Sequence, residues 1–310
     1  MSNYAIVSDA TTDLNAFFQK EFNIQIIPAH LVFPGKKEIA SFTEWEYCSR
    51  EEFYDDLKKR PDEYHTSPPN VTEIESFLIK YAEQGKDVLL ITISGGISGT
   101  YGFASAAIKN VKSKYPDVNI LCVDSGRFSS GCGVMVLRAA MNRDEGMSLE
   151  ENYKYLENNK SGFHQAGWMD DLQFVAKKGR ITHAKALIGT LAGIKSIGEF
   201  DENGLTTVIG KVRGASKAYR VLLDYIEQTI VNPSEQIIFV AHSNRLAQAE
   251  EYRRLIEERF HPKAVYVNDI FPSCGINIGP GLMAAYYYGK PISENLENEK
   301  NILKMLSDKG

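Results

Sequence analysis

The sequence has few cysteines and histidines, and their spacing excludes the common local metal and redox motifs. Its 310 residues include 4 cysteines, and no two of them form a CxxC pair. The 6 histidines are scattered, and no two of them are three to five residues apart. The sequence therefore contains neither an HExxH motif nor a zinc-finger motif. We therefore expect four buried thiols without disulfides, and neither a metal nor a cofactor.

The chain has no basic run, and we expect neither a secretory leader nor a membrane span. Lys and Arg number 35 against 40 Asp and Glu, which gives a net charge of -5 and disfavours nucleic acid as a partner. The N-terminus carries no basic stretch followed by an apolar region, so we expect a cytoplasmic protein. The uncharged stretch that we test as a membrane span, residues 270–289, contains Pro272, Asn277 and Pro280, which would leave backbone groups unpaired in lipid. We do not expect the chain to span a membrane.

Length and composition indicate a folded protein of two domains. Apolar residues make up 43% of the chain and charged residues 24%, as in an average soluble protein. A chain of 310 residues exceeds what one compact core usually organises. We place the domain boundary near residue 162, giving domains at 1–162 and 163–310.

A β then α alternation runs through residues 1–162. We expect strands at 5–8, 24–28, 88–93 and 120–123. Helices are expected at 14–22, with Thr12 or Asp13 as its cap, and at 49–59, 70–84, 100–112, 134–143 and after Ser148. The unbroken apolar run at 88–93 is typical of a central parallel strand. This pattern predicts an N-terminal doubly wound parallel-sheet α/β domain.

Antiparallel pairing enters the second half of the chain. Asn203-Gly204 separates two β-rich runs, 194–200 and 205–212, and predicts a hairpin. We expect helices at 215–230, 246–260 and 282–288, the last of them after Pro280 and carrying three tyrosines, and strands at 236–241 and 264–268. The second domain is therefore predicted to be α+β with a mixed or antiparallel sheet.

The most informative segment is a glycine- and hydroxyl-rich turn, residues 92–100, between a buried strand and a helix. Open α/β sheets bind ligands at such turns, and the free N–H groups of the helix favour an anion. The turn lacks the spacing of a dinucleotide loop or a P-loop, which disfavours nucleotides. Gly96-Ile97-Ser98-Gly99 matches part of a hydrolase elbow, so a serine acyl hydrolase using Ser98 is an alternative. Ser98 could also be only a helix N-cap.

Two further segments have unusual compositions. In Thr66-Ser67-Pro68, the proline favours extended geometry at Ser67 and would fix the direction of both hydroxyls, although an ordinary Ser-Pro turn explains the segment equally simply. The glycine-rich stretch at 275–281 includes Asn277 and Gly279, and its glycines could serve only packing.

Carboxylate pairs give a third kind of candidate. Asp9 with Asp13, and Asp170 with Asp171, could hold magnesium or do acid–base work. Aspartates at helix starts are usually caps, and we favour that interpretation here.

Taken in order, these segments resemble the DegV family of bacterial fatty-acid-binding proteins. The resemblance covers nearly the whole chain and rests on seven segments: residues 6–14, Thr66-Ser67-Pro68-Pro69, residues 93–101, Val123-Asp124-Ser125, Asp170-Asp171-Leu172, Lys178-Gly179-Arg180-Ile181 and Gly279-Pro280-Gly281. It differs at two positions, where the family commonly has a histidine in place of Asn277 and a glutamine in place of Pro68. Asparagine still donates and accepts hydrogen bonds, but it gains no proton near neutral pH.

The resemblance implies a carrier with the EDD fold rather than an enzyme. Such a carrier holds one long-chain fatty acid in a tunnel between its two domains and presents the carboxylate to a fatty acid kinase, which makes an acyl-phosphate for phospholipid synthesis. By position, the carboxylate site would comprise Thr66, Ser67, Ser98, Gly99, Asn277 and Gly279. Arg213 falls where such carriers place a surface arginine that works with the kinase. A regulatory module that binds another small carboxylate is a further alternative.

Overall fold

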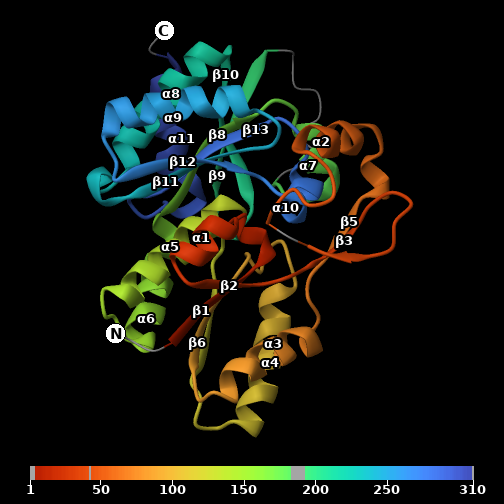
Figure 1. Cartoon of the computed structure of the whole chain (residues 1–310). Helices are drawn as coiled ribbons and strands as arrows, with labels where there is room; N and C mark the ends of the chain where they lie inside the picture. Colours follow the sequence, from red (N-terminus) through yellow and green to blue (C-terminus); the bar gives the residue numbers. More distant parts are fainter. Residues whose placement is uncertain (1–3, 42, 183–192, 309–310) are drawn as a thin grey trace. The chain divides into compact units, whose positions relative to one another are not determined.

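A computed structural model describes residues 4–41, 43–182 and 193–308 (Figure 1). The chain divides into two compact units, which we call the first and the second unit. The first contains residues 1–47, 60–160 and 271–274, and the second contains residues 48–59, 161–270 and 275–310. The chain therefore passes between the units five times, after residues 47, 59, 160, 270 and 274.

The first unit is built on a four-stranded parallel sheet. Its strands, in the order β2-β1-β6-β7, are β2 (Ile24–Ile27), β1 (Tyr4–Asp9), β6 (Asp87–Thr92) and β7 (Ile120–Asp124). One face, including Val7, Val88 and Leu90, packs against apolar residues of α3 (Val71–Ala82) and α4 (Thr100–Lys114). Because both faces are covered, the inner strands read as continuous apolar runs, and the expected doubly wound α/β architecture is confirmed.

Local capping chemistry sets where the helices of the first unit begin. The other helices are α1 (Ala16–Glu21), α5 (Ser130–Asp144) and α6 (Leu149–Asn159). Asn70 and Ser148 form capping boxes with Glu73 and Glu151, at the starts of α3 and α6.

The expected cap of the first helix is wrong. Asn15, rather than Thr12 or Asp13, accepts the hydrogen bond from the amide of Phe18 in α1. The reason is that residues 10–12 form a 3₁₀ turn, η1 (Ala10–Thr12), which ends with Asp13 in the left-handed conformation at φ 54°.

A small antiparallel sheet, which the sequence analysis missed, also belongs to the first unit. Its order is β4 (Ile39–Ala40), β3 (His30–Val32) and β5 (His65–Ser67), and a 3₁₀ turn, η2 (Pro61–Glu63), precedes β5. Strands of two or three residues are too short to show a hydrophobic period.

The second unit is built on a six-stranded mixed sheet. Its order is β10 (Thr206–Arg213), β9 (Ile194–Phe200), β8 (Phe163–Met169), β13 (Leu282–Tyr288), β11 (Ile237–His242) and β12 (Ala264–Asp269). Only β11 and β12 pair in parallel, which confirms the expected mixed sheet. The helices are α2 (Arg50–Lys59), α7 (Leu172–Lys178), α8 (Ala215–Thr229), α9 (Leu246–Phe260) and α11 (Glu297–Asp308), with 3₁₀ turns η3 (Lys160–Gly162), η5 (Pro233–Glu235) and η6 (Glu294–Leu296). The short helix α10 (Pro272–Ile278) contains the last passage of the chain between the units.

Of two local predictions for the second unit, one is wrong and one is confirmed. Residues 282–288 form the buried strand β13, not a helix, because both neighbouring strands supply backbone partners and Gly281 turns the chain at φ 106°. The predicted hairpin between β9 and β10 is confirmed, with residues 201–205 as its connection. Asp201 organises it by accepting the amides of Asn203 and Leu205, and Gly204 alone among residues 201–205 has a positive φ.

Helix α2 comes from the N-terminal half of the sequence but packs within the second unit. Tyr54 donates a hydrogen bond from its hydroxyl to the carbonyl of Ile270 at 2.6 Å, and Arg50 pairs with Asp269 at 3.0 Å. A Cβ added to Gly275 would lie 2.7 Å from the Tyr54 hydroxyl oxygen. Glycine at this position therefore permits a close approach of α2.

We predict that Gly275→Ala destabilises the protein by about 1–3 kcal/mol, because Tyr54 is fully buried and has no room to move away. Urea unfolding measures the change. In a Tyr54→Phe background the added methyl group no longer meets a hydroxyl oxygen, so the cost of Gly275→Ala should shrink. Equal costs in both backgrounds would contradict this packing.

Candidate functional site

Side-chain carboxylates from the two neighbouring strands hold the loop between β6 and α4. The carboxylate of Asp9, at the end of β1, accepts the amide of Ile93 at 2.9 Å. Asp124, at the end of β7, accepts the amide of Gly95 at 3.0 Å, and the carbonyl of Arg127 accepts the amide of Ser94 at 2.8 Å. The loop thus lies at the carboxyl edge of the parallel sheet, with carboxylates from both adjacent strands fixing its start.

The amides of residues 96–98 are occupied within the loop itself. The amide of Gly96 donates to the Ser94 hydroxyl at 3.1 Å, and the amides of Ile97 and Ser98 both donate to the Ser94 carbonyl at 3.2 Å. The amides of residues 96–98 are therefore not free to bind an anion. At the start of α4, where free amides are expected, the Thr100 amide donates to Ser98 Oγ and the Phe103 amide to the Gly99 carbonyl.

Ser98 and Thr100 form a hydroxyl pair at the end of the loop. The oxygens Ser98 Oγ and Thr100 Oγ1 lie 2.8 Å apart, and the Thr100 amide also donates to Ser98 Oγ at 3.3 Å. Ser98 is half-buried, whereas Thr100 is buried. Gly99 occupies the N-cap position of α4, so Ser98 is not the cap residue, although its oxygen does accept the first helical amide.

Burial is the main influence on the pKa of Asp9. This side chain is fully buried, and desolvation raises the pKa of its carboxyl group, although hydrogen bonds from Thr11 and from the Ile93 amide oppose the rise. Asp9 also caps η1 through the Thr11 amide, so the cap interpretation is correct here.

The other carboxylates of the predicted pairs have different roles. Asp13 is not a helix cap, since its side chain accepts the hydroxyl of Ser129 and the amide of Phe271, both within the first unit. Asp171 caps α7 through the amide of Gln173, as expected. Asp170 instead forms ion pairs with Lys195 and Arg245, in which those cations lower the pKa of its carboxyl group against the effect of burial.

Thr66 and Ser67 also belong to the first unit, on the small sheet. In β5 they pair with Leu31 and His30 of β3, and the extended geometry expected of Ser67 before Pro68 is present. Thr66 is half-buried and Ser67 is exposed. The predicted hydroxyl groups of the first unit therefore come from two places. The Ser98 hydroxyl lies on the loop after β6 of the parallel sheet, and the Thr66 and Ser67 hydroxyls lie on β5 of the small sheet.

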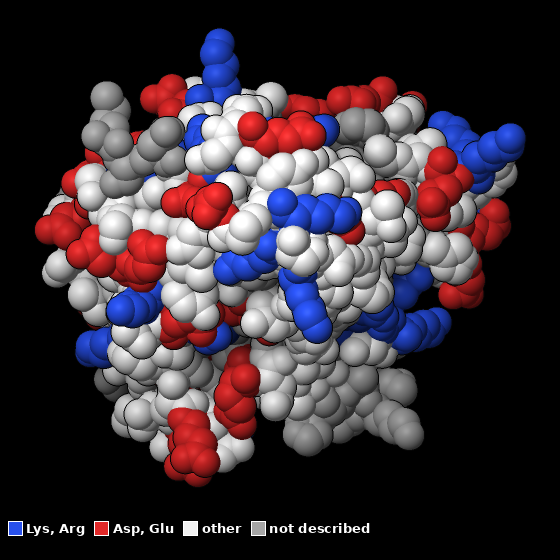
Figure 2. Space-filling view, turned by 90° about the horizontal axis from the view of Figure 1, so that it is seen from below, with Lys and Arg blue, Asp and Glu red and all other residues white. Residues whose placement is uncertain are grey.

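The remaining predicted positions belong to the second unit. Asn277 is half-buried in the last turn of α10, and Gly279 follows that helix at φ 79°. A Cβ at Gly279 would lie 2.4 Å from the ring of Phe174, so this glycine is required for packing. Arg213 is exposed at the end of β10. On the face shown in Figure 2, Lys and Arg are interspersed with Asp and Glu, in keeping with the small net charge.

The structure gives the hydrolase alternative no support at Ser98. Within the described part of the chain, the hydrogen-bond partners of Ser98 Oγ are the hydroxyl and the amide of Thr100, not a histidine or a carboxylate. The strained serine is Ser129, at φ 53° and ψ -144°, before α5. It is buried and donates to Asp13, so it is also not placed as an exposed nucleophile.

The cysteines are free thiols, as expected, but two of them are only half-buried. Cys132 and Cys274 are buried, whereas Cys48 and Cys122 are partly exposed. Burial raises the pKa of the thiols of Cys122, Cys132 and Cys274, which makes them unreactive. Among residues 4–41, 43–182 and 193–308, no cluster of three or more His, Cys, Asp or Glu side chains is arranged to hold a metal ion. The helices of these same segments include none that is long and apolar enough to cross a membrane.

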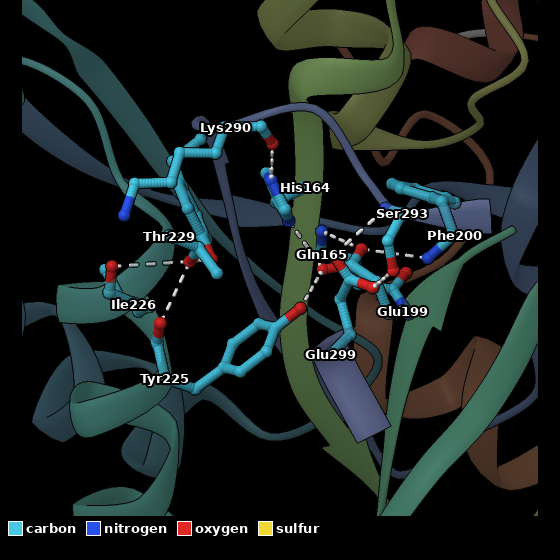
Figure 3. Close-up of polar contacts among 11 residues, drawn as sticks. His164, Gln165, Glu199, Phe200, Tyr225, Ile226, Thr229, Lys290, Ser293 and Glu299 are labelled. Carbon is cyan, nitrogen blue, oxygen red and sulfur yellow. Dashed lines mark hydrogen bonds and ion pairs between the residues drawn. The ribbon is translucent and has the colours of Figure 1, made fainter. Parts of the chain in front are cut away.

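The second unit contains a buried polar cluster that was not predicted from the sequence (Figure 3). His164 of β8 lies with Nε2 2.7 Å from the Lys290 carbonyl and with Nδ1 2.8 Å from Glu199 of β9. Glu199 also accepts the hydroxyl of Tyr225 and the amides of Gln165 and of Phe200. Every oxygen of this fully buried carboxylate is thus hydrogen-bonded, which is the condition under which a buried charge is tolerated.

Figure 3 also shows that the cluster joins β8, β9 and α8. Burial, followed by the nearby Glu199 charge, raises the pKa of Tyr225 well above its usual value, so its hydroxyl remains a donor. The ring of Tyr287 stacks on His164 at 5.2 Å. We assign this cluster a structural role in joining these elements.

A second titratable cluster lies where β11 and β12 end. His242 is buried, with Nδ1 accepting the amide of Arg245 at 3.3 Å and Nε2 lying 3.4 Å from Asp269. Desolvation lowers the pKa of His242 to about 4, although Asp269 opposes this effect, while the charge of Arg50 adds to it. His242 is therefore neutral at pH 7.

Comparison with known proteins gives a consistent result over nearly the whole chain. A family model described as "Uncharacterised protein, DegV family" matches residues 3–290. A DegV domain-containing protein of Clostridium perfringens is 28% identical over 294 residues, which cover 93% of this chain and 98% of that protein.

Two solved structures share the fold. DegV of Bacillus subtilis, described as a fatty acid binding protein, is 26% identical, with a TM-score of 0.77 over 94% of this chain and 100% of that one. A DegV family protein of Thermus thermophilus, whose structure is described as showing fatty acid binding, is 23% identical, with a TM-score of 0.82 over 93% of this chain and 100% of that one.

We predict that His242 makes the protein sensitive to acid. Its pKa is lower in the folded state than the ordinary value of 6.5, so between pH 6.5 and 4 the unfolded state binds a proton that the folded state does not. Stability should therefore fall as the pH falls through this window, by up to about 3 kcal/mol from this group.

Urea unfolding at pH 7, 5 and 4 measures this effect. His242→Asn, whose amide oxygen can still accept the Arg245 amide, should lose less stability on acidification than the wild type. His65→Asn, at an exposed position, is the control and should follow the wild type. Parallel pH profiles for the wild type and His242→Asn would contradict the assignment.

Proposed function

The chain belongs to the DegV family, and we propose that it binds one long-chain fatty acid whose carboxylate accepts hydrogen bonds from the hydroxyls of Ser98 and Thr66. The remaining head-group contacts in this proposal come from Ser67, Gly99, Asn277 and Gly279. The observation that carries it is the half-buried Ser98 hydroxyl, presented by a loop in which the amides of residues 94–98 are already bonded. The fatty acid binding described for the solved relatives supports the choice of ligand.

The carboxylate and the alkyl tail of the fatty acid contribute differently to its affinity for the protein. A neutral hydrogen bond contributes only about 1 kcal/mol net, and one to a charged group roughly 1.5–3 kcal/mol. Burial of an alkyl chain contributes about 0.8 kcal/mol per methylene, so a long chain supplies roughly 10 kcal/mol or more before the costs of association. The hydroxyls therefore set the orientation of the acid, and the tail sets most of the affinity.

We further propose that the protein is a carrier and not an enzyme. A separate fatty acid kinase would phosphorylate the presented carboxylate, giving an acyl-phosphate for phospholipid synthesis. Two observations favour this: Ser98 hydrogen-bonds to Thr100 instead of to a base, and Arg213 is exposed, as a partner-binding residue must be. Asn277, in place of the family's common histidine, makes head-group binding independent of a titrating imidazole.

We predict that Ser98→Ala lowers fatty acid affinity by roughly ten- to a hundredfold, through loss of a hydrogen bond to the carboxylate. The test is organic extraction of the purified protein with mass spectrometry of the lipid, followed by titration of the delipidated protein with oleate. Ser105→Ala, an exposed serine on α4, is the matched control and should bind as the wild type. An empty wild-type protein that ignores added fatty acids of any length would refute the proposed function.

We predict that Arg213→Ala retains bound fatty acid but supports less acyl-phosphate formation by a bacterial fatty acid kinase with ATP. Trapping the acyl-phosphate with hydroxylamine measures the product. Lys211→Ala, an exposed cation two residues earlier on β10, is the control and should retain activity. If Arg213→Ala and Lys211→Ala both match the wild type, Arg213 has no role in the partnership.

A further inference from the structure

Ser98 and Thr100 share one hydrogen bond between their hydroxyls, and its direction decides whether Ser98 can donate to a ligand. A hydroxyl group offers one hydrogen and two acceptor positions. Ser98 Oγ already accepts the Thr100 amide at 3.3 Å, and Thr100 Oγ1 lies 2.8 Å away, where either oxygen can donate. Two arrangements of the shared hydrogen bond are therefore compatible with the geometry.

The two arrangements differ in whether Ser98 presents a lone pair or a hydrogen to a ligand. If Ser98 donates to Thr100, only a lone pair of Ser98 remains, and a lone pair repels a carboxylate. If Thr100 donates to Ser98, both acceptor positions of Ser98 are filled by Thr100, and the Ser98 hydrogen is left to point at the ligand. An ionised carboxylate only accepts hydrogen bonds, so Ser98 can bind it only in the second arrangement.

We propose that Thr100 is a positioning residue, which donates from both Oγ1 and its amide to Ser98 Oγ and thereby directs the Ser98 hydroxyl hydrogen at the carboxylate of the fatty acid. This inference rests on the proposed function and adds a residue to it. Thr100 acts through Ser98 and makes no contact with the ligand itself.

The contacts around the loop explain why Thr100, and not a movement of the loop backbone, sets the direction of the Ser98 hydroxyl hydrogen. Thr100 is buried at the first position of α4, so its side chain is held by the helix. The start of the loop is equally constrained, because Asp124 accepts the Gly95 amide and a Cβ at Gly95 would lie 2.6 Å from Asp124 Oδ2. The Ser94 carbonyl holds the amide of Ser98 at 3.2 Å. With the backbone fixed on both sides, the hydroxyl orientation is the remaining variable.

Titration of the delipidated full-length protein with oleate tests this assignment. Thr100→Val keeps the shape of the side chain but removes the donor, and it should weaken binding roughly five- to tenfold. Thr100→Ser keeps the hydroxyl and should restore binding to within about twofold of the wild type. In the Ser98→Ala background, Thr100→Val should have no further effect, because the group that Thr100 directs is gone.

This double-mutant cycle of Ser98 and Thr100 distinguishes a positioning role of Thr100 from a merely structural role. A loss in Thr100→Val that persists undiminished in the Ser98→Ala background would overturn the inference, as would wild-type affinity in Thr100→Val. If Thr100→Val does not fold, as judged by thermal unfolding, Thr100→Ala supplies the same comparison.

The two proposals fail in different ways. Oleate binding that depends on Ser98 but not on Thr100 would overturn only the role of Thr100. Absence of any fatty acid binding by the wild type would overturn the proposed function and this inference together.

Discussion

The candidate site depends on the hydrogen bonds through which Asp9 and Asp124 hold the loop after β6. Each carboxylate lies at the end of a strand adjacent to β6, and each accepts a backbone amide of that loop. A glycine-rich loop is otherwise free to adopt many conformations, and fixing it costs entropy. Carboxylates supplied by the neighbouring strands compensate for that cost, so the Ser98 hydroxyl is presented in one geometry.

Elements with a local sequence signal were predictable. The buried parallel strands read as apolar runs, and the capping boxes at Asn70 and Ser148 marked helix starts correctly, because both signals involve residues close together in the chain. Strand β13 was not predictable, since its seven apolar residues suit a buried strand and a buried helix equally. Its neighbours β8 and β11, distant in sequence, decide between them.

The sequence indicated where the candidate site lies better than it indicated how the hydrogen bonds of the site are arranged. Sequence reasoning singled out the loop around Ser98 and expected free amides at the start of the following helix to favour an anion. It gave no indication that the Ser94 side chain and carbonyl bind the amides of residues 96–98. It also gave no indication of the cluster around Glu199 and His164. These residues are 35 positions apart, and only strand pairing in the second unit brings them into contact.

The five passages of the chain between its units constrain how the molecule can be recombined. A gene cut after residue 160 yields two pieces, neither of which encodes a complete unit, because residues 48–59 and 271–274 are each separated from the unit to which they belong. A functional chimera with a relative would have to exchange α2 together with the C-terminal half while leaving residues 271–274 with the N-terminal half. Homologous proteins of this architecture should therefore diverge by point substitution more readily than by exchange of whole halves.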